Sequence, residues 1–241
     1  MIKTPKMKNN INQNKSGLIT FHQINLQHSK LATHELVKQM EGLPNSIVLA
    51  QEPYFYNKLQ YIPRQIKTFS YVKSKPRSCI MHHPDLKIFP LPQFSDRDTT
   101  VGAWEPGLVD IETIFIISSY WDINHDNIPP KLVETIQYCL DNDIPYICGI
   151  DSNAWNTMWG SLEDNIRGET FEEWLLEIGA VILNRGSAPT FRTCRASSTI
   201  DISFSSPSVQ HLCTDWRIHN EPSLSDQLRL DLISVVNPLQ W

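Results

Sequence analysis

Residues 146–161, YICGIDSNAWNTMWGS, begin as an apolar run typical of a buried strand and then turn abruptly polar. A carboxylate, Asp151, and an amide, Asn153, follow the apolar run two positions apart. If the extended backbone continues that far, both side chains point to the same side of the strand. The segment therefore predicts either a polar site just beyond a sheet or a turn that Asp151 or Asn153 caps.

The rest of the chain alternates between further strands and three helices. Strands are predicted within residues 17–28, 46–54, 78–83, 108–121, 145–150, 180–184, 199–206 and 231–236. Helices are predicted within 29–41, 128–142 and 168–180, with Gly179 as a stop signal for the third. Their apolar faces are expected to be Leu31, Leu36, Val37 and Met40, then Leu132, Ile136, Cys139 and Leu140, then Phe171, Trp174, Leu175 and Ile178. Residues 54–77 are aromatic, basic and broken by proline, which predicts a long surface loop.

Many of these strands look suited to burial on both faces, which favours two packed sheets with helices outside them. The Lys- and Asn-rich residues 1–16 are predicted to be a loose tail, and residues 17–241 a single domain. The five cysteines lack metal-ligand spacing, so we expect reduced core thiols in an intracellular protein. A net charge of −5 argues against a strongly basic nucleic-acid binder but leaves room for a local basic groove. Apolar runs are too short for a membrane span, so a membrane partner is not expected.

Polar groups recur where the predicted strands end. They are Asn25, Glu52, Tyr120, Asp151 with Asn153, Asp201 and Asp226. Each alone has a plain structural explanation, such as a turn former or, for Asp201, a surface position on an amphipathic strand. Together they form the oxygen-rich set that a hard cation such as Mg²⁺ prefers.

The order of these segments resembles the endonuclease domain of non-LTR (LINE-type) retrotransposons, in the endonuclease/exonuclease/phosphatase superfamily. The segments, in order, are INLQHSK, LAQEPY, SSYW, GIDSNAWNTMWGS, RGETFEEWLLEIGAVILNRGSAPTF, STIDISFSS and SLSDQ. The resemblance runs from about Gly17 to the C-terminus. It implies a DNase I-like, four-layer αββα sandwich of two mixed β-sheets with helices on the outer faces.

The resemblance also implies a role for each polar group. Glu52 would be the principal Mg²⁺ ligand, with Mn²⁺ as a possible substitute, and Asn25 and Asp226 would lie beside the metal. Asp151 would orient or deprotonate the attacking water, Asn153 would hold that water or a phosphate oxygen, and Tyr120 would donate to the phosphate. Asp201 matches the carboxylate that supports a catalytic histidine. Such a set suits an anionic phosphodiester, which a metal ion neutralises and fixed donors stabilise in the transition state.

One position departs from the family pattern, which ends Ser-Asp-His, because this chain has Gln227 after Asp226. The amide of Gln227 can donate a hydrogen bond but carries no positive charge and cannot shuttle a proton. Losing one good transition-state donor lowers a rate by around 10²–10³. The sequence therefore predicts a weakened nuclease. His28, His82, His83, His211 and His219 are expected to be surface or loop residues, and their spacing marks none as a replacement.

The first hypothesis is a Mg²⁺-dependent endonuclease that nicks double-stranded DNA in the nucleus to prime reverse transcription by a downstream polymerase. DNA contacts would come from the 54–77 loop and from FRTCRASS, where Arg192 and Arg195 lie. The basic residues of the loop are Lys58, Arg64, Lys67, Lys73, Lys75 and Arg77. A solvated surface is the alternative explanation of this basic loop. The second hypothesis is a catalytically inactive DNA-binding or interaction domain that keeps the fold, and the third, less favoured, is a phosphatase of the same superfamily.

Overall fold

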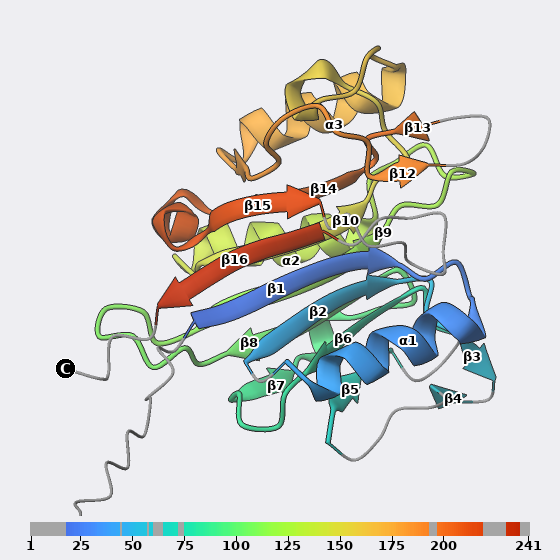
Figure 1. The fold of residues 1–241 in the computed structure, drawn as a ribbon. Helices are drawn as coiled ribbons and strands as arrows, with labels where there is room; N and C mark the ends of the chain where they lie inside the picture. Colours follow the sequence, from blue (N-terminus) through green and yellow to red (C-terminus); the bar gives the residue numbers. More distant parts are fainter. Residues whose placement is uncertain are drawn as a thin grey trace, which may run out of the picture.

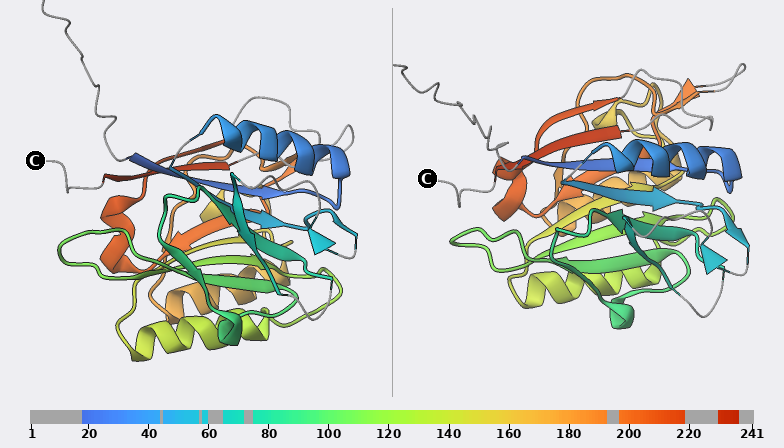
Figure 2. Two further views of the ribbon diagram at one scale, coloured as in Figure 1. Left: turned by 90° about the horizontal axis from the view of Figure 1, so that it is seen from below. Right: turned by 60° about the horizontal axis from the view of Figure 1, so that its bottom comes forward.

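A computed structural model gives the structure of residues 18–43, 45–56, 58–59, 65–71, 75–192, 197–218 and 230–236, with the backbone alone for 56, 58–59 and 230–236. The predicted tail, residues 1–16, lies outside this part of the chain. Two six-stranded mixed sheets stack face to face, and helices cover both outer faces, as Figures 1 and 2 show. This is the predicted fold class.

The first sheet has a parallel pair at its centre. Its strand order is β15 (Thr214–Ile218), β16 (Leu230–Val236), β1 (Leu18–Asn25), β2 (Ser46–Gln51), β6 (Ser78–His82) and β5 (Lys67–Phe69). Only β1 and β2 are parallel, and Asn25 is paired with Gln51 at their carboxyl ends. Residue 52 therefore leaves the sheet beside Asn25.

The second sheet repeats this plan. Its strand order is β11 (Val181–Ile182), β14 (Asp201–Ser205), β10 (Tyr146–Asp151), β9 (Ile114–Tyr120), β8 (Thr99–Trp104) and β7 (Ile88–Pro90). Here β9 and β10 are the parallel pair, and Tyr120 is opposite Asp151 at their carboxyl ends. Two small hairpins stand outside the sheets: β3 (Phe55–Tyr56) with β4 (Lys58–Leu59), and β12 (Phe191–Arg192) with β13 (Ser197–Ser198).

Three apolar clusters hold the four layers together, because strands such as β2 and β10 bury side chains on both faces. Helix α1 (Lys30–Glu41) covers the first sheet, and α2 (Pro130–Asp141) and α3 (Ile166–Glu177) cover the second, as the left view of Figure 2 shows. Between the sheets lie Phe21, Ile47, Leu49, Ile80, Trp104, Ile114, Ile116 and Ile147. Leu36, Val37 and Met40 of α1 pack on Val48, Ala50, Cys79 and Met81. Leu132, Ile136, Phe171 and Leu175 pack on Ile117, Cys148, Ile150, Ile202 and Phe204. Short 3-10 turns, η1 (Pro92–Phe94), η2 (Thr157–Trp159) and η3 (Pro207–Leu212), complete the elements.

Three local expectations about the fold were wrong. Leu31 is 62% exposed and Leu140 is 40% exposed, because the buried faces of α1 and α2 run through Thr33 and Thr135 instead. The 54–77 segment is not simply a surface loop, since β5 pairs with β6 and Ile66 is buried. Strands β7, β8, β12, β13 and β15 were not predicted.

One other expectation was met within the described residues. Four cysteines, Cys79, Cys139, Cys148 and Cys213, are buried free thiols, while Cys194 lies outside the described residues. Within the described part of the chain, no helix is long and apolar enough to cross a membrane.

Candidate active site

The carboxyl ends of the two parallel pairs meet at one edge of the sandwich. Asn25 ends β1 and Glu52 follows β2, while Tyr120 ends β9 and Asp151 ends β10. Stacking the two sheets brings residues more than a hundred positions apart into hydrogen-bond contact. The structure thus gathers the residues that the sequence placed at separate strand ends.

Asn25 joins the two sheets at this edge. Its amide nitrogen donates to Glu52 Oε2 at 3.0 Å and to Asp151 Oδ2 at 2.6 Å, while its oxygen accepts from the backbone N–H of Gln27 at 2.7 Å. The oxygen contact fixes which way the amide faces, so its donors point at both carboxylates. Asn25 and Asp151 are each 2% exposed, whereas the Glu52 side chain is 20% exposed. Glu52 therefore forms the solvent side of the group.

The backbone holds Glu52 in a strained conformation. Its φ of 46° is in the left-handed region, which costs a residue other than glycine about 1–3 kcal/mol. Its N–H donates to Arg77 O at 2.8 Å, and its carbonyl accepts from the His28 N–H at 2.8 Å. Backbone contacts on both sides keep the residue in place, and they aim the side chain at Asn25.

Asp151 is buried between charged and polar groups. Its Oδ1 accepts from the backbone N–H of Asn153 at 3.3 Å, so the turn-capping alternative is also realised. Burial is the main cause that raises the pKa of Asp151, to about 6; the hydrogen bond from Asn25 opposes the rise and the charge of Glu52 adds to it.

Asn153 reaches the site differently from the prediction. The extended backbone ends at Asp151, and Asn153 has a φ of 50°. Its side-chain nitrogen donates to Trp121 O at 3.0 Å. It therefore lies close to Asp151 through a turn and not through strand alternation.

Tyr120 and Arg77 form the next layer. Burial, then the charges of Glu52 and Asp151, raises the pKa of Tyr120, which keeps its hydroxyl protonated as a donor. The Arg77 guanidinium lies over the Tyr120 ring, 5.1 Å from its centroid, and binds Asp98 and Asp122. Arg77 is only 7% exposed, so its prediction as a DNA contact was wrong. Its ion pairs with Asp98 and Asp122 keep the Arg77 side chain buried, where it packs on the Tyr120 ring and positions it.

Asp201 lies beside Asp151, since the two residues pair directly across antiparallel strands β14 and β10. Its strand alternates as predicted: Ile202 and Phe204 face the helices, whereas Ser203 faces the first sheet and donates to Gln23. Asp201 is 1% exposed, which rules out the surface alternative. Neither carboxylate oxygen has a hydrogen-bond partner among the described residues.

The comparisons with known proteins agree with this architecture. Residues 114–228 match a family model described as endonuclease-reverse transcriptase. The endonuclease domain of TRAS1, a telomere-specific non-LTR retrotransposon, aligns with a TM-score of 0.76 and 28% identity over 92% of this chain and 100% of its own. The chain is thus similar over residues 114–228 to the endonuclease-reverse transcriptase family, and similar over most of its length to a retrotransposon endonuclease domain.

Two more distant structures share this fold. An AP endonuclease from Leishmania major aligns with a TM-score of 0.71 and 11% identity, over 90% of this chain and 88% of its own. A 3'-5' exonuclease from Neisseria meningitidis aligns with a TM-score of 0.59 and 13% identity, over 90% and 100%. No curated protein sequence matches the chain significantly.

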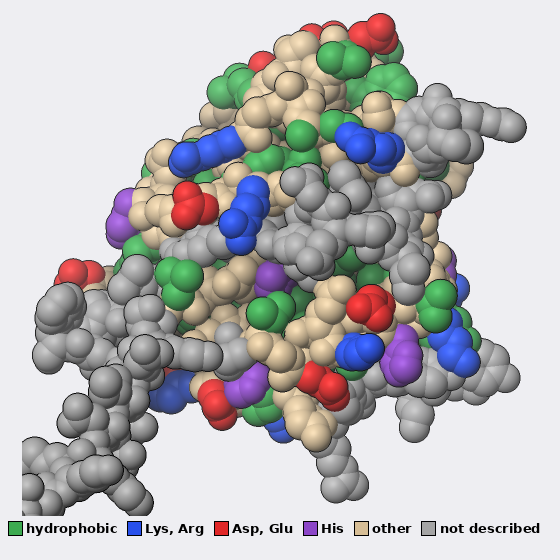
Figure 3. Space-filling model, viewed as in Figure 1, with side chains coloured by type: hydrophobic (Ala, Val, Ile, Leu, Met, Phe, Trp, Pro, Cys, Tyr) green, Lys and Arg blue, Asp and Glu red, His purple; other side chains and the backbone are tan. Residues whose placement is uncertain are grey.

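Several of the predicted site residues lie outside the described residues. They are Arg64, Lys73, Arg195, Asp226 and Gln227, together with His219. Arg192 is exposed on the β12–β13 hairpin, and Lys67 and Lys75 are also exposed. Figure 3 shows basic side chains scattered among acidic and neutral ones over the described part of one face. Geometry alone therefore does not outline a basic groove on that face.

The histidines divide into three environments. His82 is 4% exposed within β6, so its expected surface position was wrong; strand pairing on both sides buries it. His83 and His211 follow the expectation of loop or surface positions. His28 is a loop residue as expected, but its Nε2 lies 3.4 Å from Glu52 Oε1. Spacing in the sequence gave no sign of this contact.

Sequence reasoning also missed Arg167, on the first turn of α3. Its guanidinium donates to the backbone oxygens of Trp121, Asp122, His125 and Ser152, at 2.7 to 3.0 Å, and stacks on the Trp121 ring at 3.7 Å. It ties the loop after β9 to the loop after β10, and so supports Tyr120 and Asn153.

The donor set at the strand ends fits a hard divalent cation. Glu52 and Asp151 provide two carboxylates within reach of one amide, and Mg²⁺ needs only one or two protein carboxylates because it keeps several waters. Among the described residues, no group of three or more His, Cys, Asp or Glu is placed to hold a metal on its own.

Proposed function

We propose that the domain is a Mg²⁺-dependent DNA endonuclease that nicks duplex DNA to prime reverse transcription of a retrotransposon. The observation that carries this proposal is the contact of Asn25 with both Glu52 and Asp151 at the joined strand ends. The similarity to the TRAS1 endonuclease domain supports the substrate class and the link to a retrotransposon. The match to the endonuclease-reverse transcriptase family supports a reverse transcriptase in the same polyprotein. We propose that the domain acts in the nucleus.

Glu52 would hold the metal, together with Asp226, and Asn25 would lie beside the metal and position Glu52 through its amide nitrogen. When bound, the cation would neutralise charge on the scissile phosphate. Mn²⁺ would be a substitute, since carboxylate oxygens suit both ions. The greater exposure of Glu52 agrees with this assignment, because a cation and a phosphate must reach it from solvent.

The remaining residues would act on the nucleophile and the phosphate. Asp151 would take a proton from the attacking water, and its raised pKa makes it a better acceptor near neutral pH. Asn25 would keep Asp151 and Glu52 apart while holding both. Tyr120 would donate its hydroxyl to the phosphate, since its raised pKa keeps the proton in place. The Asn153 side-chain amide would also form a hydrogen bond with the attacking water or with a phosphate oxygen.

Gln227 would weaken catalysis without abolishing it. Asp201 would ordinarily orient a histidine at position 227, and an amide there offers no charge. The same substitution favours a second candidate, a binding domain that keeps the fold but does not cleave. DNA contacts in either case would come from Arg64, Lys73, Arg192 and Arg195.

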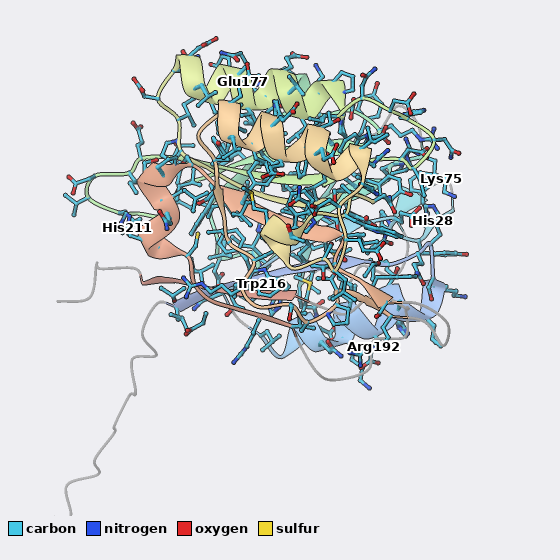
Figure 4. The ribbon with its side chains drawn as sticks, turned by 90° about the horizontal axis from the view of Figure 1, so that it is seen from above. His28, Lys75, Glu177, Arg192, His211 and Trp216 are labelled. Carbon is cyan, nitrogen blue, oxygen red and sulfur yellow. The ribbon has the colours of Figure 1, made fainter. Side chains whose placement is uncertain are left out.

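A supercoiled-plasmid nicking assay with Mg²⁺ tests the proposal. We expect slow nicking by the chain, a gain of about 10²–10³ in Gln227→His, and a loss of at least about 10² in Glu52→Ala. Glu177→Ala is the control, because Glu177 is an exposed acid at the end of α3, away from His28 in Figure 4. Failure of both the chain and Gln227→His to nick DNA would support the binding domain instead.

A further inference from the structure

His28 lies against the solvent side of the proposed metal ligand. Its Nε2 is 3.4 Å from Glu52 Oε1, while Glu52 Oε2 accepts a hydrogen bond from the Asn25 amide. The imidazole is 37% exposed. The ring therefore stands at the entrance to the group and not behind it.

The backbone holds His28 in this place. Gln27 and His28 have φ values of 48° and 53°, both in the left-handed region, and the His28 N–H donates to Glu52 O at 2.8 Å. Two consecutive left-handed residues turn the chain back along Pro53 directly after β1. Such strain persists where surrounding contacts enforce it, often at functional sites.

The second ring nitrogen determines what Nε2 can offer. Nδ1 lies 3.3 Å from the Pro53 carbonyl, which can only accept, so this hydrogen bond places a proton on Nδ1. With the proton on Nδ1, Nε2 is the ring nitrogen that can bind a cation, and it lies beside the Glu52 carboxylate. A backbone carbonyl bound to the other ring nitrogen is also the usual support of a metal-ligating histidine.

We propose that His28 is a nitrogen ligand that joins Glu52 at the metal site and biases the site toward Mn²⁺ over Mg²⁺. Two neighbouring ligands on an octahedral ion lie about 3 Å apart when each bond is about 2.1 Å, close to the observed separation. Mg²⁺ prefers oxygen, whereas imidazole favours transition-metal ions. The inference rests on the proposed function, in that it assumes a cation at Glu52.

The location of His28 agrees with this role. In Figure 4 it lies at one end of the molecule and His211 at the opposite end. Lys75, which lies in the segment before β6, is at the same end as His28. Because His28 and Glu52 are more exposed than Asp151, a cation arriving from solvent would meet these two residues first.

Direct cation binding tests the proposal without relying on catalysis. Mn²⁺ binding to the whole chain is measured from the free-ion electron paramagnetic resonance signal, and Mg²⁺ binding by competition. His28→Asn is the main variant, because asparagine tolerates a left-handed φ. His83→Asn is the matched control, since His83 Nδ1 lies 3.4 Å from the exposed Asp85 and away from the site.

We expect His28→Asn to weaken Mn²⁺ binding at least about tenfold and Mg²⁺ binding much less, with His83→Asn unchanged. Equal losses for both ions would show that His28 only positions Glu52, and no loss would show no role; either result overturns the inference. If Glu52→Ala abolishes binding while His28→Asn matches the unmodified chain, the metal site stands and the inference fails. Absence of Mn²⁺ binding in the unmodified chain would instead contradict the proposed metal site. A metal-free thermal melt confirms that each variant is folded.

Discussion

At the scale of single residues, Asp201 shows the electrostatic cost of this site. Burial raises the pKa of Asp201 well above the usual range, and the Asp151 charge raises it further. The folded chain therefore holds a proton that the unfolded chain releases. The stability that this proton contributes is full below the ordinary pKa of aspartate and is lost as the pH rises through the higher folded pKa.

We therefore expect Asp201→Asn to stabilise the metal-free chain more at pH 8 than at pH 5. The gain should grow by up to about 1.4 kcal/mol for each pH unit, until the folded pKa is reached. Urea denaturation at both pH values measures the difference. Asp110→Asn, at an exposed acid, is the control. If Asp201→Asn changed the unfolding free energy equally at the two pH values, Asp201 would be ionised in the folded chain and its charge stabilised by neighbouring groups.

At the scale of elements, the start of α3 supports the loop that follows Asp151. Asn165 caps the helix: its side-chain oxygen accepts from Gly168 N at 2.7 Å and from Trp155 N at 3.2 Å. Gly168 packs so closely that an added Cβ would lie 1.8 Å from the Trp155 backbone oxygen. Helix and loop thus approach each other through backbone atoms, which cannot move aside as a side chain can.

Gly168→Ala should accordingly destabilise the chain, although alanine favours helices. Overpacking typically costs about 1–3 kcal/mol, more than the roughly 1 kcal/mol of helix propensity that alanine adds. Gly42→Ala, after α1, is the control, because its Cβ would meet only the Gln39 oxygen at 3.6 Å. Chemical denaturation of both variants gives the comparison. If Gly168→Ala left the unfolding free energy unchanged, the loop at residues 155–156 would be free to move away from the helix.

At the scale of the whole molecule, buried polar bridges set how the two sheets lie on each other. Gln23 of β1 donates to Ile150 O at 3.0 Å and accepts from Ser203 Oγ at 3.0 Å. Gln51 of β2 donates to Ser118 Oγ and to Gly149 O, at 3.1 and 3.2 Å. Directional bonds inside an apolar interface penalise sliding of the sheets, since any slip leaves buried groups unpaired. These bridges lie one or two residues before Asn25, Glu52 and Asp151, so they also align the site.

Replacing Gln23 with leucine should weaken the sandwich by about 1–3 kcal/mol for each buried group left unpaired. Gln137→Leu serves for comparison, because Gln137 is exposed on α2 and its side chain donates to the neighbouring Asp141. Unfolding free energies of the two variants should differ clearly. Similar small losses would indicate that apolar packing alone aligns the sheets.

The sequence by itself determined the local features of this protein. The helices predicted within 29–41, 128–142 and 168–180 were found at 30–41, 130–141 and 166–177. These helices, the strands that end near Asn25, Gln51, Tyr120 and Asp151, and the alternation around Asp201 follow from side-chain periodicity and capping residues, which act over a few positions. The resemblance extended these to the fold class. Strand β8 was missed because its two threonines and glycine weaken the apolar pattern.

Only the tertiary structure decided which side chains meet and which are buried. Stacking the parallel pairs of two sheets placed Asn25 against Asp151, 126 positions later, and buried Asp201 beside it. It also turned Arg77 inward, enclosed His82 and set His28 against Glu52. Each of these depends on the pairing of segments far apart in the chain. A local pattern carries no information about such pairing, because the partner that satisfies or buries a group lies outside its window.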